Sequence, residues 1–228
     1  MTRHLHIGAI AFPGVDQADL TGPFEVLVRL PDSTFHIIWK ETAPVRDVKG
    51  FVLTPDTTFA QVPPLDLLVV PGGWGQEALM EDEAVLGFLR AYATADRPIL
   101  SVCTGALLLG AAGLLRGARA TTHWSAFHLL KYFGALPVRE RVVVHGKLIS
   151  AAGVTSGIDG ALRMAALLRG ETIAQQIQLG IEYAPEPPFE CGTPELAPAD
   201  ILASVQEAYR EITAARLATA QRYAERFA

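Results

Sequence analysis

Short apolar runs alternate along the chain with longer segments of helical periodicity. The runs at residues 6–12, 34–39, 65–70 and 98–102 have the length and composition of strands. The last two are almost continuously apolar, which is typical of parallel strands covered on both faces. Helical patterns occupy residues 22–30, 83–95, 105–115, 125–133, 156–168 and 172–183. This alternation predicts a flavodoxin-like α/β fold with a doubly wound, mostly parallel sheet.

The last third of the chain departs from this alternation. Residues 141–145 and 148–151 predict a β-hairpin, with Gly146 in its turn. Residues 184–194 are rich in proline and form either a domain linker or an ordered loop. We expect a loop, because the single helix predicted for residues 198–227 cannot form a domain by itself. The expectation is one domain over residues 1–228, with a C-terminal helix from about residue 197 packed on its body.

Composition and charge narrow the classes of partner. The 228 residues include 19 lysines and arginines and 24 aspartates and glutamates, a formal net charge of −5. A nucleic-acid surface needs clustered basic residues, and the sequence has no such run. Because no stretch of 18 apolar residues is present, we expect no membrane span. Two cysteines make neither a disulfide framework nor a zinc pattern, which favours the reducing cytoplasm.

Cys103 occupies the position of a nucleophile. The segment Ser101-Val-Cys-Thr-Gly105 directly follows an apolar strand and opens a helix, which is the context of a nucleophile elbow. The partial positive charge of a helix N-terminus favours thiolate, so we expect a lowered pKa for this thiol. Ser101 stands where such elbows usually have glycine. The alternative is an inert thiol in the core, where free cysteines are usually found.

Two further loops follow predicted strands, and we expect them to meet Cys103 at the same edge of the sheet. One of them, Val70-Pro-Gly-Gly-Trp-Gly75, contains glycines whose backbone N–H groups can face a developing negative charge. An ordinary turn is the alternative for such a loop. With the cysteine loop beside it, we expect an oxyanion hole formed by the N–H groups of Gly73 and Thr104.

The other loop, Asp16-Gln-Ala-Asp-Leu-Thr-Gly-Pro23, supplies a carboxylate. Pro23 is placed as the first residue of a helix, which would make Gly22 the cap of that helix. Asp19 then lies too early to be the cap, so its carboxylate needs another role. Asp16 is expected to have a simple surface or turn role.

Several segments together resemble the ThiJ/PfpI superfamily, whose members have a class I glutamine-amidotransferase-like fold. They are Val15-Asp-Gln-Ala-Asp-Leu-Thr-Gly-Pro23, Val70-Pro-Gly-Gly73, Ser101-Val-Cys-Thr-Gly105, Thr121-Thr-His-Trp124 and Gly153-Val-Thr-Ser-Gly-Ile-Asp159. From about residue 5 to the C-terminus, the chain is most similar to the isocyanide hydratase family of that superfamily.

This resemblance implies a chemistry as well as a fold. It implies Cys103 as nucleophile and Asp19, where many superfamily members have glutamate, as the carboxylate that moves protons. It further implies a homodimer, no cofactor, and a small-molecule isocyanide as substrate. The implied reaction adds water to the isocyanide and gives an N-formamide through a thioimidate bound to Cys103.

Two other functions are compatible with the same residues. A cofactor-free glyoxalase or deglycase would use Cys103 and Asp19 on an aldehyde. AraC-type regulators contain very similar Asp-Leu-x-Gly-Pro and Thr-His-Trp segments in a non-enzymatic ligand-binding domain. They continue into a helix-turn-helix pair, however, whereas this chain offers one terminal helix and an acidic balance.

His123 is the histidine to weigh as a partner of Cys103. A Cys–His pair would indicate a protease or an amidotransferase. Superfamily proteases typically have histidine directly after the cysteine, where this chain has Thr104, so we expect a structural role for His123. No two histidines have the spacing of metal ligands on one helical face, and no metal site is predicted.

Overall fold

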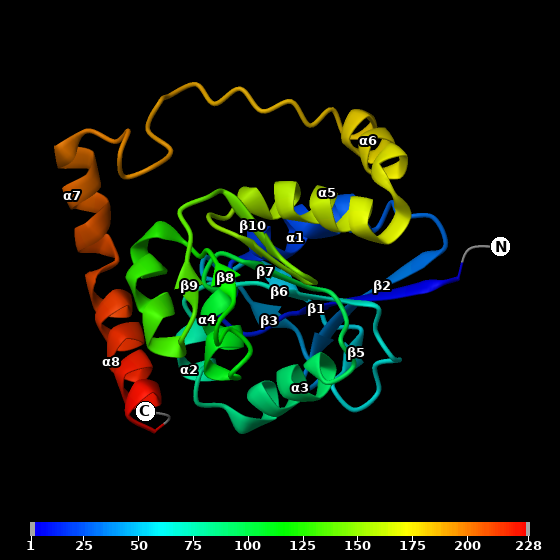
Figure 1. The fold of residues 1–228 in the computed structure, drawn as a ribbon, viewed down its shortest axis with the longest axis horizontal. Helices are drawn as coiled ribbons and strands as arrows, with labels where there is room; N and C mark the ends of the chain where they lie inside the picture. Colours follow the sequence, from blue (N-terminus) through cyan, green and yellow to red (C-terminus); the bar gives the residue numbers. More distant parts are fainter. Residues whose placement is uncertain (1–2, 227–228) are drawn as a thin grey trace.

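The computed structural model describes residues 3–226, which form a central sheet with helices on both faces (Figure 1). The seven-stranded sheet has the order β10–β11–β7–β6–β1–β2–β5. Every pairing is parallel except that of β10 with β11, the predicted hairpin. The strands are β1 (Leu5–Ile10), β2 (Ser33–Trp39), β5 (Thr57–Thr58), β6 (Leu67–Val70), β7 (Ile99–Val102), β10 (Val142–His145) and β11 (Leu148–Ala151). The predicted doubly wound sheet is confirmed.

Helices follow the strands in the alternation expected from the sequence. They are α1 (Gln17–Leu27), α2 (Gln76–Leu79), α3 (Glu83–Ala93), α4 (Gly105–Ala111), the 3₁₀ helix η1 (Trp124–Phe133), α5 (Ser156–Arg169), α6 (Glu171–Gly180), α7 (Ala199–Ala208) and α8 (Arg210–Arg226). Two small two-stranded pairs lie outside the main sheet: β3 (Val45–Arg46) with β4 (Val52–Leu53), and β8 (Arg119–Ala120) with β9 (Leu136–Pro137). These pairs, α2 and β5 were not predicted.

The core lies between the sheet and its helices. All residues of β6 and β7 are buried, as their apolar sequences predict for strands covered on both faces. Helices α1 and α5 pack together on one face of the sheet, and α3 and α4 lie on the other (Figure 1). Such central strands are rigid supports for the loops that follow their carboxyl ends.

The first helix begins earlier than predicted. Asp16, with an extended backbone, caps α1 by accepting a hydrogen bond from the N–H of Ala18 at 3.1 Å. The expectation that Gly22 caps a helix opened by Pro23 is therefore wrong, and Pro23 lies inside α1. A proline there lacks the N–H that would have bonded to the carbonyl of Asp19. The correction places Asp19 in the first turn of α1 rather than in a loop before it.

The C-terminal region also differs from its prediction. The single helix expected over residues 198–227 is two helices, α7 and α8, which meet at Tyr209; residue 227 lies outside the described residues. α8 packs against η1 and α2, whereas α7 has no buried residue. The segment expected to be an α-helix over residues 125–133 is the 3₁₀ helix η1. Residues 184–198 form a long arc between α6 and α7 (Figure 1).

Candidate active site

Three loops meet at the carboxyl ends of β1, β6 and β7, as predicted. The N–H of Asp16 donates to the carbonyl of Gly72 at 2.9 Å, and the N–H of Gly72 donates to Oδ2 of Asp19 at 2.9 Å. The N–H of Gly73 donates to Oγ1 of Thr104 at 3.2 Å. The glycine loop thus joins the aspartate segment to the cysteine loop, and Asp19 and Cys103 lie in one site.

Cys103 has the backbone of a nucleophile elbow. Its φ is +54°, a left-handed conformation that non-glycine residues rarely adopt. The turn is held on both sides, since the N–H of Cys103 donates to the carbonyl of Ala151 at 3.0 Å and its carbonyl accepts from Oγ1 of Thr122 at 2.7 Å. A Cβ at Gly105 would collide with the carbonyl oxygen of Val70, so only glycine lets α4 begin this close to β6. Strain of this kind is typical of functional sites.

The thiol faces a small pocket. Cys103 is 7% exposed, and the pocket beside it has a volume of about 50 Å³. Its walls come from the three loops, from the start of η1, from the loop between β11 and α5, and from α8 and the residue before it. They are Asp16, Gly73, Trp74, Cys103, Thr104, His123, Ser125, Val154, Tyr209, Ile212 and Arg216. Only a small or narrow reactive group fits next to the sulfur.

Asp19 is a carboxyl group suited to hold a proton. It is fully buried, and burial, with a smaller contribution from the charge of Asp16, raises its pKa to about 8. The N–H of Gly72 and the Cys103 thiol lower that pKa in part. The thiol is a weak hydrogen-bond donor, and Oδ1 of Asp19 has no close hydrogen-bond partner within residues 3–226. A carboxyl group with this pKa can act as an acid and as a base near neutral pH.

The predicted lowering of the Cys103 pKa is wrong. Burial raises the pKa of the thiol well above its ordinary value, and the negative charge of Asp19 raises it further. The N–H of Thr104 and the guanidinium of Arg216 act in the opposite direction. The helix N-terminus that the sequence indicated is present, but the dry interior and the neighbouring carboxyl outweigh it. Cys103 and Asp19 therefore titrate as a coupled pair.

The two expected oxyanion donors lie in the pocket but face different partners. The N–H of Gly73 is directed at Oγ1 of Thr104, and the N–H of Thr104 hydrogen-bonds to the Cys103 thiol. Gly73 has a φ of +129°, which favours glycine, and its carbonyl accepts a hydrogen bond from the buried Arg216 at 2.6 Å. Thr104 is thus placed to stabilise the sulfur anion itself. An oxyanion role for the pair remains a prediction.

His123 is a cap of η1 in this structure. Its Nδ1 lies 2.8 Å from Oγ of Ser125 and accepts from the N–H of Ser125 at 3.4 Å. Burial, together with the positive charge of Arg216, lowers its pKa to about 4, so the imidazole is neutral at physiological pH. Its ring lies 5.9 Å from that of Tyr209, in the pocket wall. These contacts agree with the structural role expected from the sequence.

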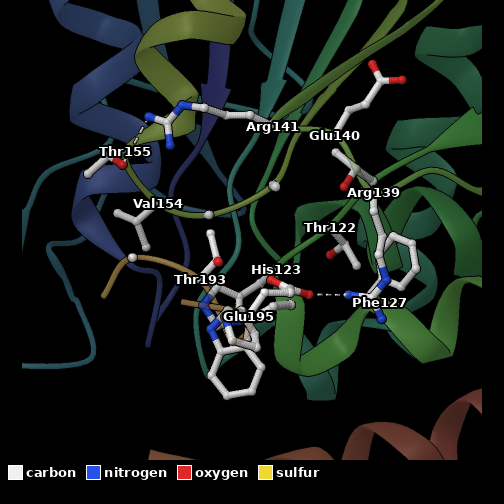
Figure 2. Close-up of a pocket in the computed structure, with 16 residues that line it drawn as sticks. Thr122, His123, Phe127, Arg139, Glu140, Arg141, Val154, Thr155, Thr193 and Glu195 are labelled. Carbon is white, nitrogen blue, oxygen red and sulfur yellow. Dashed lines mark hydrogen bonds and ion pairs between the residues drawn. The ribbon is translucent and has the colours of Figure 1, made fainter. Parts of the chain in front are cut away.

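A larger cavity of about 600 Å³ adjoins the small pocket (Figure 2). The two share His123 and Val154 in their walls. Apolar groups of Trp124 and Phe127 line one side of the larger cavity, and Arg139 lies over the Phe127 ring and pairs with Glu195 at 3.4 Å. A substrate whose reactive end fits beside Cys103 can place an organic group in this cavity.

Residues 3–226 contain neither a metal-ligand cluster nor a membrane-spanning helix. Within that range, no three histidine, cysteine, aspartate or glutamate side chains are grouped so that they could hold a metal ion. Nor does the described part of the chain contain a helix both long and apolar enough to cross a membrane.

Comparison with known proteins assigns the family. The DJ-1/PfpI family model matches residues 6–167, which include the three loops of the site. The chain belongs to the DJ-1/PfpI family. The match ends at residue 167, before α6, α7 and α8.

Three relatives of this DJ-1/PfpI protein are informative. The isonitrile hydratase of Pseudomonas putida is 52% identical over 198 residues, which cover 87% of each chain. A THiJ/PfpI family protein from Pseudomonas syringae has a crystal structure that superposes with a TM-score of 0.92 at 38% identity, covering 96% of this chain and 91% of that one. A deglycase from Pyrococcus horikoshii is 32% identical over 104 residues, 45% of this chain and 63% of its own.

Sequence reasoning missed one residue of the site, Arg216. It is 4% exposed and reaches the pocket from α8, beyond the segment that matches the family. Its Nη2 donates to the carbonyl of Gly73 at 2.6 Å, and its Nε donates to Oε1 of Gln76 at 3.1 Å. The signal was its position one helical turn before the buried Ala220, on the face of α8 that packs on the body.

Proposed function

We propose that this protein is an isocyanide hydratase, which adds water to an isocyanide, R–N≡C, to give an N-formamide, R–NH–CHO. The observation that carries the proposal is its 52% identity to an isonitrile hydratase over 87% of both chains. The site is consistent with that chemistry, because a strained cysteine lines a narrow pocket and a proton-holding carboxyl, Asp19, lies against its thiol. Cys103 is the nucleophile, and Asp19 is the acid and base.

The first step adds the thiol across the terminal carbon of the isocyanide. The Cys103 sulfur forms a bond to that carbon while its proton, relayed through the Asp19 carboxyl, is delivered to the same carbon. The product is a thioimidate, R–N=CH–S–Cys103. The pair gives up one proton in this step, and Asp19 is left as a carboxylate. A backbone N–H from Thr104 stabilises the sulfur while it carries negative charge.

The second step hydrolyses the thioimidate. The Asp19 carboxylate takes a proton from a water molecule as its oxygen bonds to the thioimidate carbon, and passes that proton to nitrogen. The resulting R–NH–CH(OH)–S–Cys103 then collapses, breaking the carbon–sulfur bond, and the hydroxyl proton returns to the pair. Formamide leaves and the starting protonation state is restored. One carboxyl group with a pKa near 8 serves both steps without a histidine.

The pocket supports an isocyanide as the substrate class. The isocyanide group is linear and narrow, which suits a space of about 50 Å³ beside the sulfur. The organic group R is accommodated by the adjoining cavity of about 600 Å³, whose walls include Trp124 and Phe127. We therefore expect aryl and other bulky isocyanides to be accepted.

We further propose that the protein is a cytoplasmic homodimer. Large apolar side chains are exposed on α5, on α6 and in the loop after it: Leu167, Leu179 and Phe189. A second copy of the chain covering them would remove this apolar surface from water. Sedimentation velocity at micromolar concentration measures the mass, and a monomer at that concentration would refute the dimer.

The activity is tested by incubating the purified protein with p-nitrophenyl isocyanide and, separately, with methylglyoxal. We expect formation of N-(p-nitrophenyl)formamide and little loss of methylglyoxal. Mass spectrometry with H₂¹⁸O would place the heavy oxygen in the formyl group. Turnover of methylglyoxal with no hydration of any aryl or alkyl isocyanide would favour the glyoxalase or deglycase function instead.

A further inference from the structure

Arg216 is a buried cation with unusual partners. Its guanidinium donates to three neutral oxygens: the Gly73 carbonyl at 2.6 Å, Oε1 of Gln76 at 3.1 Å and Oγ1 of Thr104 at 3.4 Å. Within residues 3–226, no carboxylate forms an ion pair with it. A buried guanidinium without an anionic partner is costly, so its charge calls for an explanation in the function of the site.

Part of the negative charge that Arg216 faces belongs to the reacting groups. Ionised Cys103, Glu77, ionised Tyr209 and ionised Asp19 interact favourably with Arg216, and they offset part of the lowering of its pKa by burial. Arg216 in turn lowers the pKa of the Cys103 thiol and of the Asp19 carboxyl. A negative charge on the catalytic pair therefore adds to the compensation of Arg216 that Glu77 supplies.

Other titratable groups near the thiol cannot replace this cation. Asp16 and Asp19 approach from α1, and Glu77 from α2; all three are acidic. His123, in the pocket wall, is neutral above a pKa of about 4. Tyr209 contributes a phenol at the start of α8. Among these groups only Arg216 is positively charged at neutral pH.

We propose that Arg216 is a positioning residue of the active site: its guanidinium ties the glycine loop to the cysteine elbow and offsets the negative charge that Cys103 and Asp19 carry during turnover. The part concerning turnover rests on the proposed function. Helix α8 is the element that delivers this charge, and it is anchored beside the site by the hydrogen bond from Thr219 to Glu77 at 2.6 Å and by the ion pair of Arg222 with Glu81 at 2.8 Å. Helix α8, which lies beyond the residues matched by the family model, thus completes the site.

The test measures the reactivity of the thiol without any substrate. Arg216→Gln keeps an amide donor and removes the charge, whereas Arg216→Lys keeps the charge and removes the planar fork. The rate of Cys103 labelling by iodoacetamide is followed by peptide mass spectrometry between pH 6 and 10. We expect the midpoint of labelling in Arg216→Gln to rise by about one pH unit, a roughly tenfold slower reaction on the acid side. Arg216→Lys should keep the wild-type midpoint.

Arg210→Gln is the matched control on the same helix. Its guanidinium pairs with Glu207 at the surface, so its loss should leave the labelling midpoint unchanged. Circular dichroism and thermal melts establish that each variant is folded. If Arg216→Gln does not fold, Arg216→Met replaces it, because methionine fills the apolar part of the site without charge.

Steady-state kinetics add a second readout. The isocyanide is uncharged, so Arg216→Gln should lower kcat about tenfold or more and change KM little. Arg216→Lys should also lose kcat while keeping the labelling midpoint, because its compact ammonium lacks the planar fork that spans the three oxygens. An unchanged labelling midpoint in a folded Arg216→Gln or Arg216→Met variant would overturn the proposal, as would an equal shift in Arg216→Lys. Absence of isocyanide turnover in the wild type would refute the hydratase function alone, because the labelling assay does not depend on it.

Discussion

An ionised carboxylate at Asp19 raises the pKa of the Cys103 thiol, and the thiol in return stabilises that carboxylate through a weak hydrogen bond. Two buried acids in such contact hold a proton between them more readily than either gives it up to solvent. Addition of a thiol to an isocyanide places both the sulfur and a hydrogen on the same carbon atom, so a proton must be available next to the sulfur. The pairing therefore matches the first step proposed for isocyanide hydration.

Replacing Cys103 should abolish hydration and leave the fold intact. Cys103→Ser keeps the size of the side chain and its hydrogen bonds but removes the nucleophilic sulfur. We expect no measurable formamide and a wild-type melting curve. Cys191→Ser is the matched control, since Cys191 lies in the loop between α6 and α7 and outside the pocket. Cys103→Ala removes every nucleophilic atom from this side chain, and more than a trace of activity in that variant would rule out a covalent mechanism.

Replacing Asp19 should slow turnover while the thiol stays in place. Asp19→Asn still accepts a hydrogen bond from Gly72 but cannot cycle a proton, so we expect kcat to fall by roughly 10²–10⁴-fold. Asp19→Glu keeps the acid at greater length and should lose less if the pocket can adjust. Asp200→Asn, at an exposed position in the first turn of α7, is the control. Wild-type rates in Asp19→Asn would reduce Asp19 to a structural residue.

The pH dependence of kcat should reflect the ionisation of the Asp19 carboxyl group. With a pKa of about 8 for Asp19, the fully protonated pair dominates at pH 6 and loses its first proton as the pH rises toward 8. The proposed first step uses the pair with one proton, so kcat should rise over this interval. In Asp19→Asn the rise near pH 8 should disappear. A wild-type profile that is flat from pH 6 to 9 would contradict the shared-proton mechanism.

The fold was predictable because its strongest signals are local. The apolar runs of β6 and β7 fit only covered parallel strands, and the turn glycine of the hairpin, Gly146, has a φ of +60° as required. The start of α1 was missed because Pro23 suggested a helix start, whereas the carboxylate of Asp16 provides the actual cap.

The sequence predicted which loop residues form the site, but it did not predict their pKa values. Cys103 and Asp19 follow strands whose ends must meet, so their proximity was expected from topology. The pKa of Cys103 was predicted in the wrong direction because it depends on burial and on a neighbouring charge, which emerge only from packing. Arg216 was missed because α8 has several arginines, and only the docking of the helix shows which of them is buried.

Replacing His123 should leave most of the activity. Its Nδ1 accepts from Ser125 and the ring is neutral above a pKa of about 4, so it serves neither as a base for Cys103 nor as a charge in the pocket. Asparagine is a good helix cap, and His123→Asn should keep kcat within tenfold of wild type, with an unchanged pH profile. His123→Leu, which lacks the cap, should lower the melting temperature. A loss of 10³-fold or more in kcat for a folded His123→Asn would instead indicate a Cys–His pair.

Asp19 should make the protein less stable as the pH rises toward 8. In the unfolded chain its carboxyl group ionises near its ordinary pKa of 3.8, whereas in the folded protein it holds the proton up to about pH 8. Between these values the folded state binds more protons, so the contribution of Asp19 is fully present below pH 3.8 and is lost as the pH rises. The limiting slope for one group is about 1.4 kcal/mol per pH unit.

Asp19→Asn removes this pH-dependent contribution to the free energy of unfolding. The variant should therefore become more stable relative to wild type as the pH increases. Urea unfolding at pH 4.5, 6.0 and 7.5 measures the difference in the free energy of unfolding, which we expect to change by on the order of 2–4 kcal/mol in favour of Asp19→Asn. Other titrating groups are common to both proteins and cancel in the difference. Asp200→Asn should show no such trend, because that carboxyl is exposed. A difference that stays constant from pH 4.5 to 7.5 would mean that Asp19 is already ionised in the folded protein, and then the catalytic pair could not lose its first proton near pH 8, as the pH profile of kcat requires.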